Sequence, residues 1–559
     1  MKTIPVAAIV FIAVLALAAL LRAGCLVDGV WEDPFDYHHT DESLLPYEAL
    51  ASWEGVVPRE LGWPGATTRL ALSAVYAMDM VLWQPGLLFS PTALFDAISA
   101  RTQQHLADPT RLVVLGRVMV LLIGLGQVAL TWWALRRWSS LHAAWLGAVL
   151  SAMAPVLVLY SQLILADMTG ALFATWLVGL AGGANSAPRR RALAFGVLVG
   201  LAAASKYHFA VWLLPAALWI WFDVADRSRG ARLVDLTLLG LSSALVLMLL
   251  VPWWWINPIL ALKEFLHVVA AKLDTGAGST GGLVAHIRLA FAALGCVLWL
   301  GLAPGIASVK EDWRQRLPLL VVVVVWSLFT ASAAQVYERY FMPMVPAALV
   351  LAALGWEAWL TSPTCWLRRA GFLALFLALA ATLSQVVQDQ QFAGKLDSYG
   401  QAHQWLLAHL QQGDRVAADS LYGRHLPRTR VQLAALIAER SGPDAYARKL
   451  VSNRLSAHDG QPFRNAVLND ELYELHWLRR ELGGREKGTG YIVDFHDARE
   501  LFNSRPTNEV FADFVHGLEN PTEGYDYLLS RQPLPGREAD VVFAGQPGPK
   551  LYLYQRRKP

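Results

Sequence analysis

Long apolar segments constrain the fold of this chain more than any other feature. After residue 110, apolar runs of about 15–25 residues follow one another, long enough to cross a bilayer as helices if some are short or tilted. These runs lie near 111–135, 142–160, 166–184, 192–205, 207–222, 233–254, 287–309, 317–334, 341–360 and 370–388. Hydrophobic residues make up 55% of the 559 residues and charged residues only 16%, which leaves too little polar surface for a soluble globule. The sequence therefore predicts a polytopic α-helical membrane protein.

The N-terminal segment supplies one more apolar run, at 4–21. We interpret it as an uncleaved first helix, because an apolar stretch of about 18 residues can span a membrane and further spans follow. A cleaved signal peptide is the alternative. A lipoprotein signal ending at Cys25 is disfavoured, because such signals carry Leu three residues before the cysteine and this chain has Arg22 there. With the first helix, about eleven transmembrane helices are predicted.

Basic residues are clustered in every second connection between the predicted helices. The clusters are Arg136 and Arg137; Arg189, Arg190 and Arg191; Arg227, Arg229 and Arg232; Lys310, Arg314 and Arg316; and Arg368 and Arg369. Because positive charge marks cytoplasmic connections, the remaining connections are expected outside the cytoplasm. The run at 192–222 has no Gly or Pro in its polar interruption, "AAASKYHFA". We expect two short helices broken at Ser205–Lys206, because one long helix would put the flanking arginine clusters on opposite faces.

This arrangement brings four polar features to the extracytoplasmic face. They are the first long loop (about 24–110), the connection holding Asp167, the break at Lys206 and the connection "QVYERYFMP" with Arg339. Ionisable residues at membrane depth are costly and usually functional. We therefore expect a site at the outer membrane boundary.

The apolar runs stop after residue 388. The helical pattern of "GQAHQWLLAHLQQG" is followed by the strand-like runs "RVAADS", "YIVDF", "YDYLLS", "DVVFAG" and "LYLYQ". The sequence therefore predicts two domains: a transmembrane domain at 1–388, which includes the long first loop, and a soluble extracytoplasmic α/β domain at 389–559.

The first loop contains the stretch "DYHHTDESLLPYEAL", with Asp41 and Glu42 adjacent. They are either part of a solvated acidic loop, since carboxylates are frequent over 28–60, or a catalytic pair. In the second case one carboxylate is a general base that takes a proton from an attacking hydroxyl. Adjacent carboxylates raise each other's pKa, which favours proton transfer.

The order of these motifs resembles that of GT-C glycosyltransferases of the protein O-mannosyltransferase and aminoarabinose-transferase type, family 39. These enzymes use polyprenyl-phosphate-linked sugars. The similarity is carried by "HHTDE", "YSQLILADMTGALF", "AAASKYHFAVWLLPAAL", "ERYFMPMVPAALVLAALG" and "SYGQAHQWLLAHLQQGDRVAADS". This chain has "LGWPGATTRL" where family members usually carry a Pro-Pro-Leu element, so the donor sugar and the acceptor stay open.

The resemblance implies an enzyme of the bacterial plasma membrane that transfers a sugar from a polyprenyl-phosphate donor to an acceptor hydroxyl on a protein, lipid or glycan. Transfer would proceed by inverting direct displacement on the extracytoplasmic face, with Asp41 as the base and Glu42 as its partner. The residues expected to bind substrate are His39, Asp167, Lys206, Tyr207, Arg339 and Tyr340. Lys206 and Arg339 would stabilise the leaving phosphate.

Simpler roles exist for several of these residues. Each cation can extend toward lipid headgroups, and Asp167 can cap a helix. His38 and His39 can contribute to a divalent-metal site with Asp41, although no third His or Cys lies at a recognised spacing.

Other classes of protein are disfavoured. The net charge is only +3 and the basic residues are scattered in short clusters, so no nucleic-acid partner is expected. The main alternatives are a transporter or flippase, or a polymerase of lipid-linked glycans. A transporter is disfavoured because the polar groups gather at one boundary rather than at the midplane.

Overall fold

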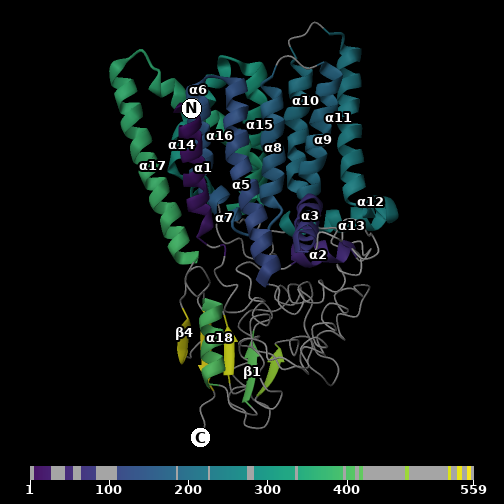
Figure 1. Ribbon diagram of the computed structural model, residues 1–559, viewed down its shortest axis with the longest axis vertical. Helices are drawn as coiled ribbons and strands as arrows, with labels where there is room; N and C mark the ends of the chain where they lie inside the picture. Colours follow the sequence, from purple (N-terminus) through teal and green to yellow (C-terminus); the bar gives the residue numbers. More distant parts are fainter. Residues whose placement is uncertain are drawn as a thin grey trace. The chain divides into compact units, whose positions relative to one another are not determined.

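The structure is a computed structural model. It describes residues 6–24, 26, 44–53, 65–83, 110–183, 187–223, 227–273, 283–333, 338–393, 398–409, 414–418, 473–477, 527–530, 538–543 and 551–555. The chain forms two compact units. The first contains the helices up to α17, and the second contains α18 and a β-sheet (Figure 1). The domain bounds expected from the sequence stay predictions.

Apolar helices build the first unit. Six described segments are long and apolar enough to cross a membrane, and they lie in α5 (Thr110–Trp138), α11 (Arg229–Leu250), α14 (Leu283–Ala307) with η3 (Ser308–Lys310), α15 (Trp313–Ser332), η4 (Glu338–Met344) with α16 (Val345–Leu360), and α17 (Cys365–Ala393). Shorter apolar helices are α1 (Val6–Ala23), α6 (Leu141–Met153), α8 (Asp167–Ala181) and η2 (Tyr207–Trp212) with α10 (Leu213–Trp221). The remaining helices are α2 (Leu44–Trp53), α3 (Ala66–Trp83), α7 (Pro155–Tyr160), α9 (Pro188–Ser205), α12 (Trp253–Ile256) and α13 (Pro258–Leu273).

A helix lies on each of the eleven apolar runs predicted from the sequence. The chain is therefore a polytopic helical membrane protein, as predicted. How many of the shorter helices cross the membrane stays a prediction.

The predicted break at Ser205–Lys206 is confirmed. Helix α9 ends at Ser205, and Lys206 is extended, with φ −159° and ψ 129°. The chain then continues through η2 into α10. Arg191, near the start of α9, forms an ion pair with Asp223, just after α10. Helices α9 and α10 are therefore antiparallel, and Lys206 lies at the opposite end of α9, roughly 22 Å away at 1.5 Å per residue.

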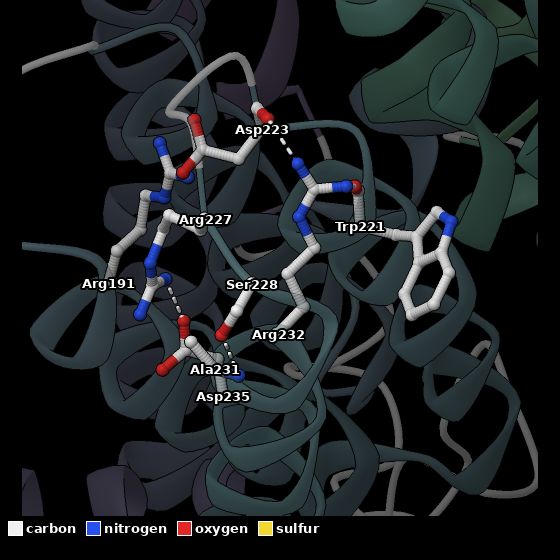
Figure 2. A network of polar contacts seen from close by, with 8 residues as sticks. All are labelled: Arg191, Trp221, Asp223, Arg227, Ser228, Ala231, Arg232 and Asp235. Atoms are coloured by element: carbon white, nitrogen blue, oxygen red, sulfur yellow. Dashed lines mark hydrogen bonds and ion pairs between the residues drawn. The ribbon is translucent and has the colours of Figure 1, made fainter.

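Figure 2 shows the end of the bundle that holds Arg191, which we call the basic end. Arg227 forms an ion pair with Asp235, a buried residue of α11. Arg232 donates to the backbone oxygens of Trp221 and Asp223, at 2.9 and 3.3 Å. The arginine clusters before α9 and after α10 thus lie together, as the charge pattern predicts.

Contacts at the basic end extend to other helices. The Trp219 indole N–H donates to the Gln315 carbonyl at 2.9 Å, which joins the end of α10 to the start of α15. Trp138, the last residue of α5, packs against Trp219 with ring centres 6.0 Å apart, and the adjacent Ser139 donates to Glu357, near the end of α16, at 2.8 Å. The connections with basic clusters after α5, before α9, before α11 and before α15 are therefore on one side of the bundle.

Helices α14 and α16 pack with their backbones in close contact. A Cβ atom added at Gly305 would overlap the Leu351 backbone, and one added at Gly355 would overlap that of Gly301. Only glycine allows this approach, which fixes α16 in the interior.

The second unit contains α18 (Ser398–His409) and strands β1 (Asp414–Ala418), β2 (Tyr473–Trp477), β3 (Tyr527–Ser530), β4 (Val541–Phe543) and β5 (Leu551–Gln555), in the sheet order β2-β1-β3-β5-β4. Strand β1 is parallel to β2 and β3, with Val416 opposite Tyr527, and β5 is antiparallel to β3 and β4. Helix α18 and strands β1, β3, β4 and β5 confirm the predicted runs, while "YIVDF" lies outside the described residues. Strand β2 was not predicted, because the leucines around it also fit a helical spacing.

The topology leads to a first prediction. Reporter fusions after Arg137, Arg191, Arg232, Arg316 and Arg369 should report cytoplasm, because the basic clusters mark the inner side. Fusions after Lys272 and within 389–559 should report the outside. A cytoplasmic signal from the C-terminal fusions would contradict the predicted orientation.

Candidate functional site

A buried ion pair between Asp167 and Lys206 is the centre of the candidate site. The Lys206 Nζ lies 2.8 and 2.9 Å from the two carboxylate oxygens of Asp167. The two residues are only 3% and 6% exposed. Because each charge is removed from water, the attraction between the two offsets part of the cost of burying them.

The two charges come from helix ends. Asp167 is in the first turn of α8, where the helix dipole favours a negative charge, but Ala166 is the N-cap and no side chain caps the helix. The Asp167 side chain therefore does not cap helix α8. Lys206 follows the last residue of α9, so the helix break itself presents the ammonium group to α8.

Arg339 lies on η4, which packs against α7, α8 and η2. It is 9% exposed, and its guanidinium carbon lies 6.0 Å from the centre of the Tyr340 ring. The Tyr160 hydroxyl is hydrogen-bonded to the backbone of Arg339, and Tyr160 is close enough to Asp167, Glu338 and Arg339 to interact electrostatically with each. We call Tyr160, Asp167, Lys206, Glu338 and Arg339 the site cluster.

Aromatic side chains hold η2 and η4 together. The Trp212 indole N–H donates to the Pro343 carbonyl at 2.9 Å, and the Trp326 indole N–H donates to the Tyr340 carbonyl. The His208 ring packs against Trp326 and Tyr340, with its centre 5.5 Å from that of the Trp326 ring and 5.8 Å from that of the Tyr340 ring. Lys206 and Arg339 thus stand at the starts of two adjoining 3₁₀ helices.

Tyr207 turns toward another part of the bundle. Its hydroxyl accepts a hydrogen bond from the Trp254 indole at 3.2 Å, and its ring packs edge-on against Phe265 at 5.2 Å. Tyr207 therefore links Lys206 to α12 and α13.

Helix α3 of the first loop is anchored beside the central ion pair. The Gly65 N–H donates to the Ser205 carbonyl at 3.0 Å, and the Thr67 and Ser205 hydroxyls are hydrogen-bonded. The Thr68 hydroxyl donates to that of Thr169 at 2.8 Å. Since Ser205 precedes Lys206 and Thr169 is in the same turn as Asp167, the start of α3 is tied to both partners.

Helix α2 is attached in turn to α3. The Arg69 Nη1 lies 3.3 Å from the Glu48 Oε2, and the Ser73 hydroxyl donates to the Ala49 carbonyl at 3.1 Å. Burial raises the pKa of the Glu48 carboxyl to about 7, against the opposing effect of Arg69. This carboxyl therefore titrates near neutral pH.

The residues expected from the sequence fall into two groups. The structure brings Asp167, Lys206, Arg339 and Tyr340 to one end of the bundle, with Tyr207 adjoining. His38, His39, Asp41 and Glu42 lie outside the described residues. Within the described part of the chain, no three His, Cys, Asp or Glu residues are grouped to hold a metal ion.

Three residues of the site were not predicted: Tyr160, Glu338 and His208. Each lies in a motif that carries the family resemblance, within two residues of a predicted residue or at the motif's start. Their positions depend on where α7, η2 and η4 meet, which residue types alone do not reveal.

This arrangement can bind an anionic group. Lys206 and Arg339 bring ammonium and guanidinium donors to one end of the bundle, and a guanidinium suits bidentate contact with phosphate. Asp167 offsets the charge of Lys206 before a ligand arrives.

The chain was compared with known proteins. No protein-family model matches it, and no curated protein sequence matches it. Among solved structures, it is similar to the Archaeoglobus fulgidus oligosaccharyltransferase in the apo form, with a TM-score of 0.46, 12% identity, and coverage of 80% of this chain and 68% of the other.

Two ligand-bound structures are also similar. Archaeoglobus fulgidus AglB in complex with an inhibitory peptide and a dolichol-phosphate has a TM-score of 0.47, 13% identity and coverage of 80% and 68%. ArnT from Cupriavidus metallidurans bound to undecaprenyl phosphate has a TM-score of 0.46, 14% identity and coverage of 80% and 88%. The function proposed below rests on the chain's own residues.

The buried ion pair leads to a second prediction. Asp167→Ala leaves Lys206 buried without its carboxylate and should lower the stability by about 3–5 kcal/mol. Removing both charges, with Asp167→Asn and Lys206→Met together, should lower the stability less than removing the charge of Asp167 alone or of Lys206 alone. Thermal or denaturant unfolding of the purified protein measures these differences.

An exposed ion pair provides the matched control. Glu311→Gln removes the partner of Arg316, where the Glu311 side chain is 64% exposed, and should cost less than about 1 kcal/mol. Equal losses for Asp167→Ala and Glu311→Gln would contradict the importance of the buried pair.

The Glu48 carboxyl leads to a third prediction. Its pKa is about 7 in the folded protein and 4.5 in the reference state, so its contribution to stability is complete below about pH 4.5 and is lost as the pH rises through 7. Hydrogen exchange of α2 should therefore become faster over this pH range, after correction for intrinsic rates. Glu48→Gln should remove the dependence, whereas Glu311→Gln should leave it in place. If hydrogen exchange of α2 depended on pH in the same way in Glu48→Gln, another titrating group would be responsible.

Proposed function

We propose that this protein is a membrane glycosyltransferase. It moves a sugar from a polyprenyl-phosphate-linked donor to an acceptor hydroxyl, at the end of the bundle that holds the site cluster. The observation that carries the proposal is the buried Asp167–Lys206 pair with Arg339 on the adjoining η4 and the first-loop helix α3 anchored on both partners.

The phosphate of the donor binds Lys206 and Arg339. Negative charge grows on this phosphate as the bond to the sugar breaks, and fixed cations in a site shielded from water stabilise it without reorganising. Asp167 holds the Lys206 side chain in place before the donor arrives. The burial of both cations supports this role over extension toward lipid headgroups.

The acidic pair of the first loop supplies the base. Asp41 precedes the start of α2, at Leu44, by three residues, which reach about 10 Å when fully extended. Because α2 is attached to α3 and α3 to Ser205 and Thr169, this short tether limits how far Asp41 and Glu42 can lie from the α2–α3 anchor. The tether supports a role for the pair at this site.

Transfer is a single displacement. Asp41 takes the proton of the acceptor hydroxyl as the hydroxyl oxygen attacks the anomeric carbon. The bond from that carbon to the phosphate oxygen breaks, and the polyprenyl phosphate leaves with the electron pair. The configuration at the anomeric carbon is inverted, and Glu42 orients Asp41. The proton then passes from Asp41 to water.

The proposal leads to a fourth prediction. Asp41→Asn keeps the shape of the side chain but cannot accept the proton, so turnover should fall by about 10²–10⁴-fold with little change in donor binding. Glu42→Gln should be less damaging if Glu42 only orients its neighbour. Transfer of label from a polyprenyl-phosphate sugar measures both.

A carboxylate elsewhere in the same loop provides the control. Glu60→Gln should leave turnover near that of the wild type. If Glu42→Gln abolishes turnover and Asp41→Asn does not, Glu42 is the base. If both variants stay active, the acidic pair is not catalytic.

A further inference from the structure

Arg22 has a buried side chain that the proposed mechanism does not use. It lies in the last turn of α1 and is 0% exposed. Its Nη1 donates to the carbonyls of Ala152 at 2.7 Å and of Ala18, in its own helix, at 3.1 Å. Its Nη2 donates to the Ser151 carbonyl at 3.0 Å.

The two carbonyls on α6 lie where the helix is interrupted. Helix α6 ends at Met153, and Ala154, with φ −57° and ψ 118°, turns the chain before α7 begins at Pro155. In a continuous helix the N–H of residue 155 would donate to the Ser151 carbonyl, but proline has no N–H. The last carbonyls of a helix need donors from elsewhere, and a cation at this end also meets the negative pole of the helix dipole.

The segment after the break leads directly to the site. Helix α7 ends at Tyr160, and the following buried turn ends at Asp167. The amide of Gln162 in this turn donates to the Val158 carbonyl at 3.2 Å and reaches the Leu21 carbonyl at 3.5 Å. The C-terminal turn of α1 therefore contacts the chain both before and after α7.

Side chains pack tightly around the α6–α7 break. Leu21 of α1 packs with Met153, Val158 and Val386 in one buried cluster. A Cβ atom added at Gly124 of α5 would lie 2.7 Å from the Ser161 Cβ and 3.2 Å from the Arg22 Nε, so α5 closes the other side.

We propose that Arg22 is a positioning residue: it replaces the hydrogen bond to the Ser151 carbonyl that Pro155 removes, adds one to the Ala152 carbonyl, and so fixes Tyr160 and the turn that leads to Asp167. Its effect on donor binding rests on the proposed function, whereas its effect on the break does not. Arg22 acts through the backbone of α6 and α7 and contacts no substrate.

The experiment uses the full chain in lipid nanodiscs with four variants: Arg22→Met, Arg22→Lys, Pro155→Ala, and Arg22→Met with Pro155→Ala. The first measurement is hydrogen exchange over residues 156–166, which needs no ligand. Arg22→Met should lower protection there at least tenfold while protection of α16 is unchanged. Arg22→Lys, with one nitrogen in place of the guanidinium fork, should give an intermediate loss. Pro155→Ala offers an N–H to Ser151, so Arg22→Met should cost less in that background.

The second measurement is binding of undecaprenyl phosphate, used as the lipid-phosphate probe. Arg22→Met should weaken binding at least fivefold at a temperature where the protein stays folded. The control is Trp219→Phe, which removes an N–H that donates to the Gln315 carbonyl at 2.9 Å at the basic end, away from the break. This control should lower the Tm without changing binding or exchange at 156–166.

Unchanged exchange at 156–166 in Arg22→Met would overturn the proposal. Equal losses of protection from Arg22→Met in the Pro155 and Pro155→Ala backgrounds would also overturn it. A wild-type protein that binds no undecaprenyl phosphate would instead count against the proposed function, and the exchange measurement would still decide the role of Arg22.

Discussion

The ion pair between Asp167 and Lys206 is the interaction on which the rest of the site depends. Both charges are buried, so separating them would remove the attraction that offsets the cost of burying each ion in a poorly solvating interior. The pair thereby fixes the start of α8 against the end of α9. Helix α3 is hydrogen-bonded to the neighbours of both partners, and η4 packs against α8 and η2. A shift of either helix would therefore move every other part of the site.

The two ends of the bundle use charge differently. At the basic end, arginines pair with Asp223 and Asp235 and with helix-terminal carbonyls, and these contacts join successive helices (Figure 2). At the other end, the charges of Asp167, Lys206 and Arg339 are buried beside aromatic side chains. Charges at the basic end thus fix the direction in which each helix crosses the bundle. As a result, Asp167, Lys206 and Arg339 lie together at the opposite end.

The sequence predicts this helix topology but not the side-chain contacts that result from it. Charge parity requires a break within 192–222, since one long helix would separate Arg191 from Arg227, and the polar interruption locates that break at Lys206. It does not show that Lys206 pairs with Asp167, 39 residues earlier, because that contact depends on how α8 packs against α9. The role of Arg22 is hidden for the same reason, since its acceptors are backbone carbonyls about 130 residues away. Strand β2 was missed because its pairing with β1, rather than its own residue pattern, makes it a strand.

The central claim is that Lys206 and Arg339 hold the phosphate of a lipid-linked sugar while the sugar is transferred. The most direct test incubates the purified protein with a panel of radiolabelled polyprenyl-phosphate sugars and cell-envelope acceptors. The account predicts that label from at least one donor moves to an acceptor with release of the polyprenyl phosphate. It also predicts that transfer is lost when Arg339→Ala is combined with Lys206→Met and Asp167→Asn in a protein that remains folded. Movement of intact donor across proteoliposomes without cleavage, or undiminished transfer by the triple variant, would contradict it.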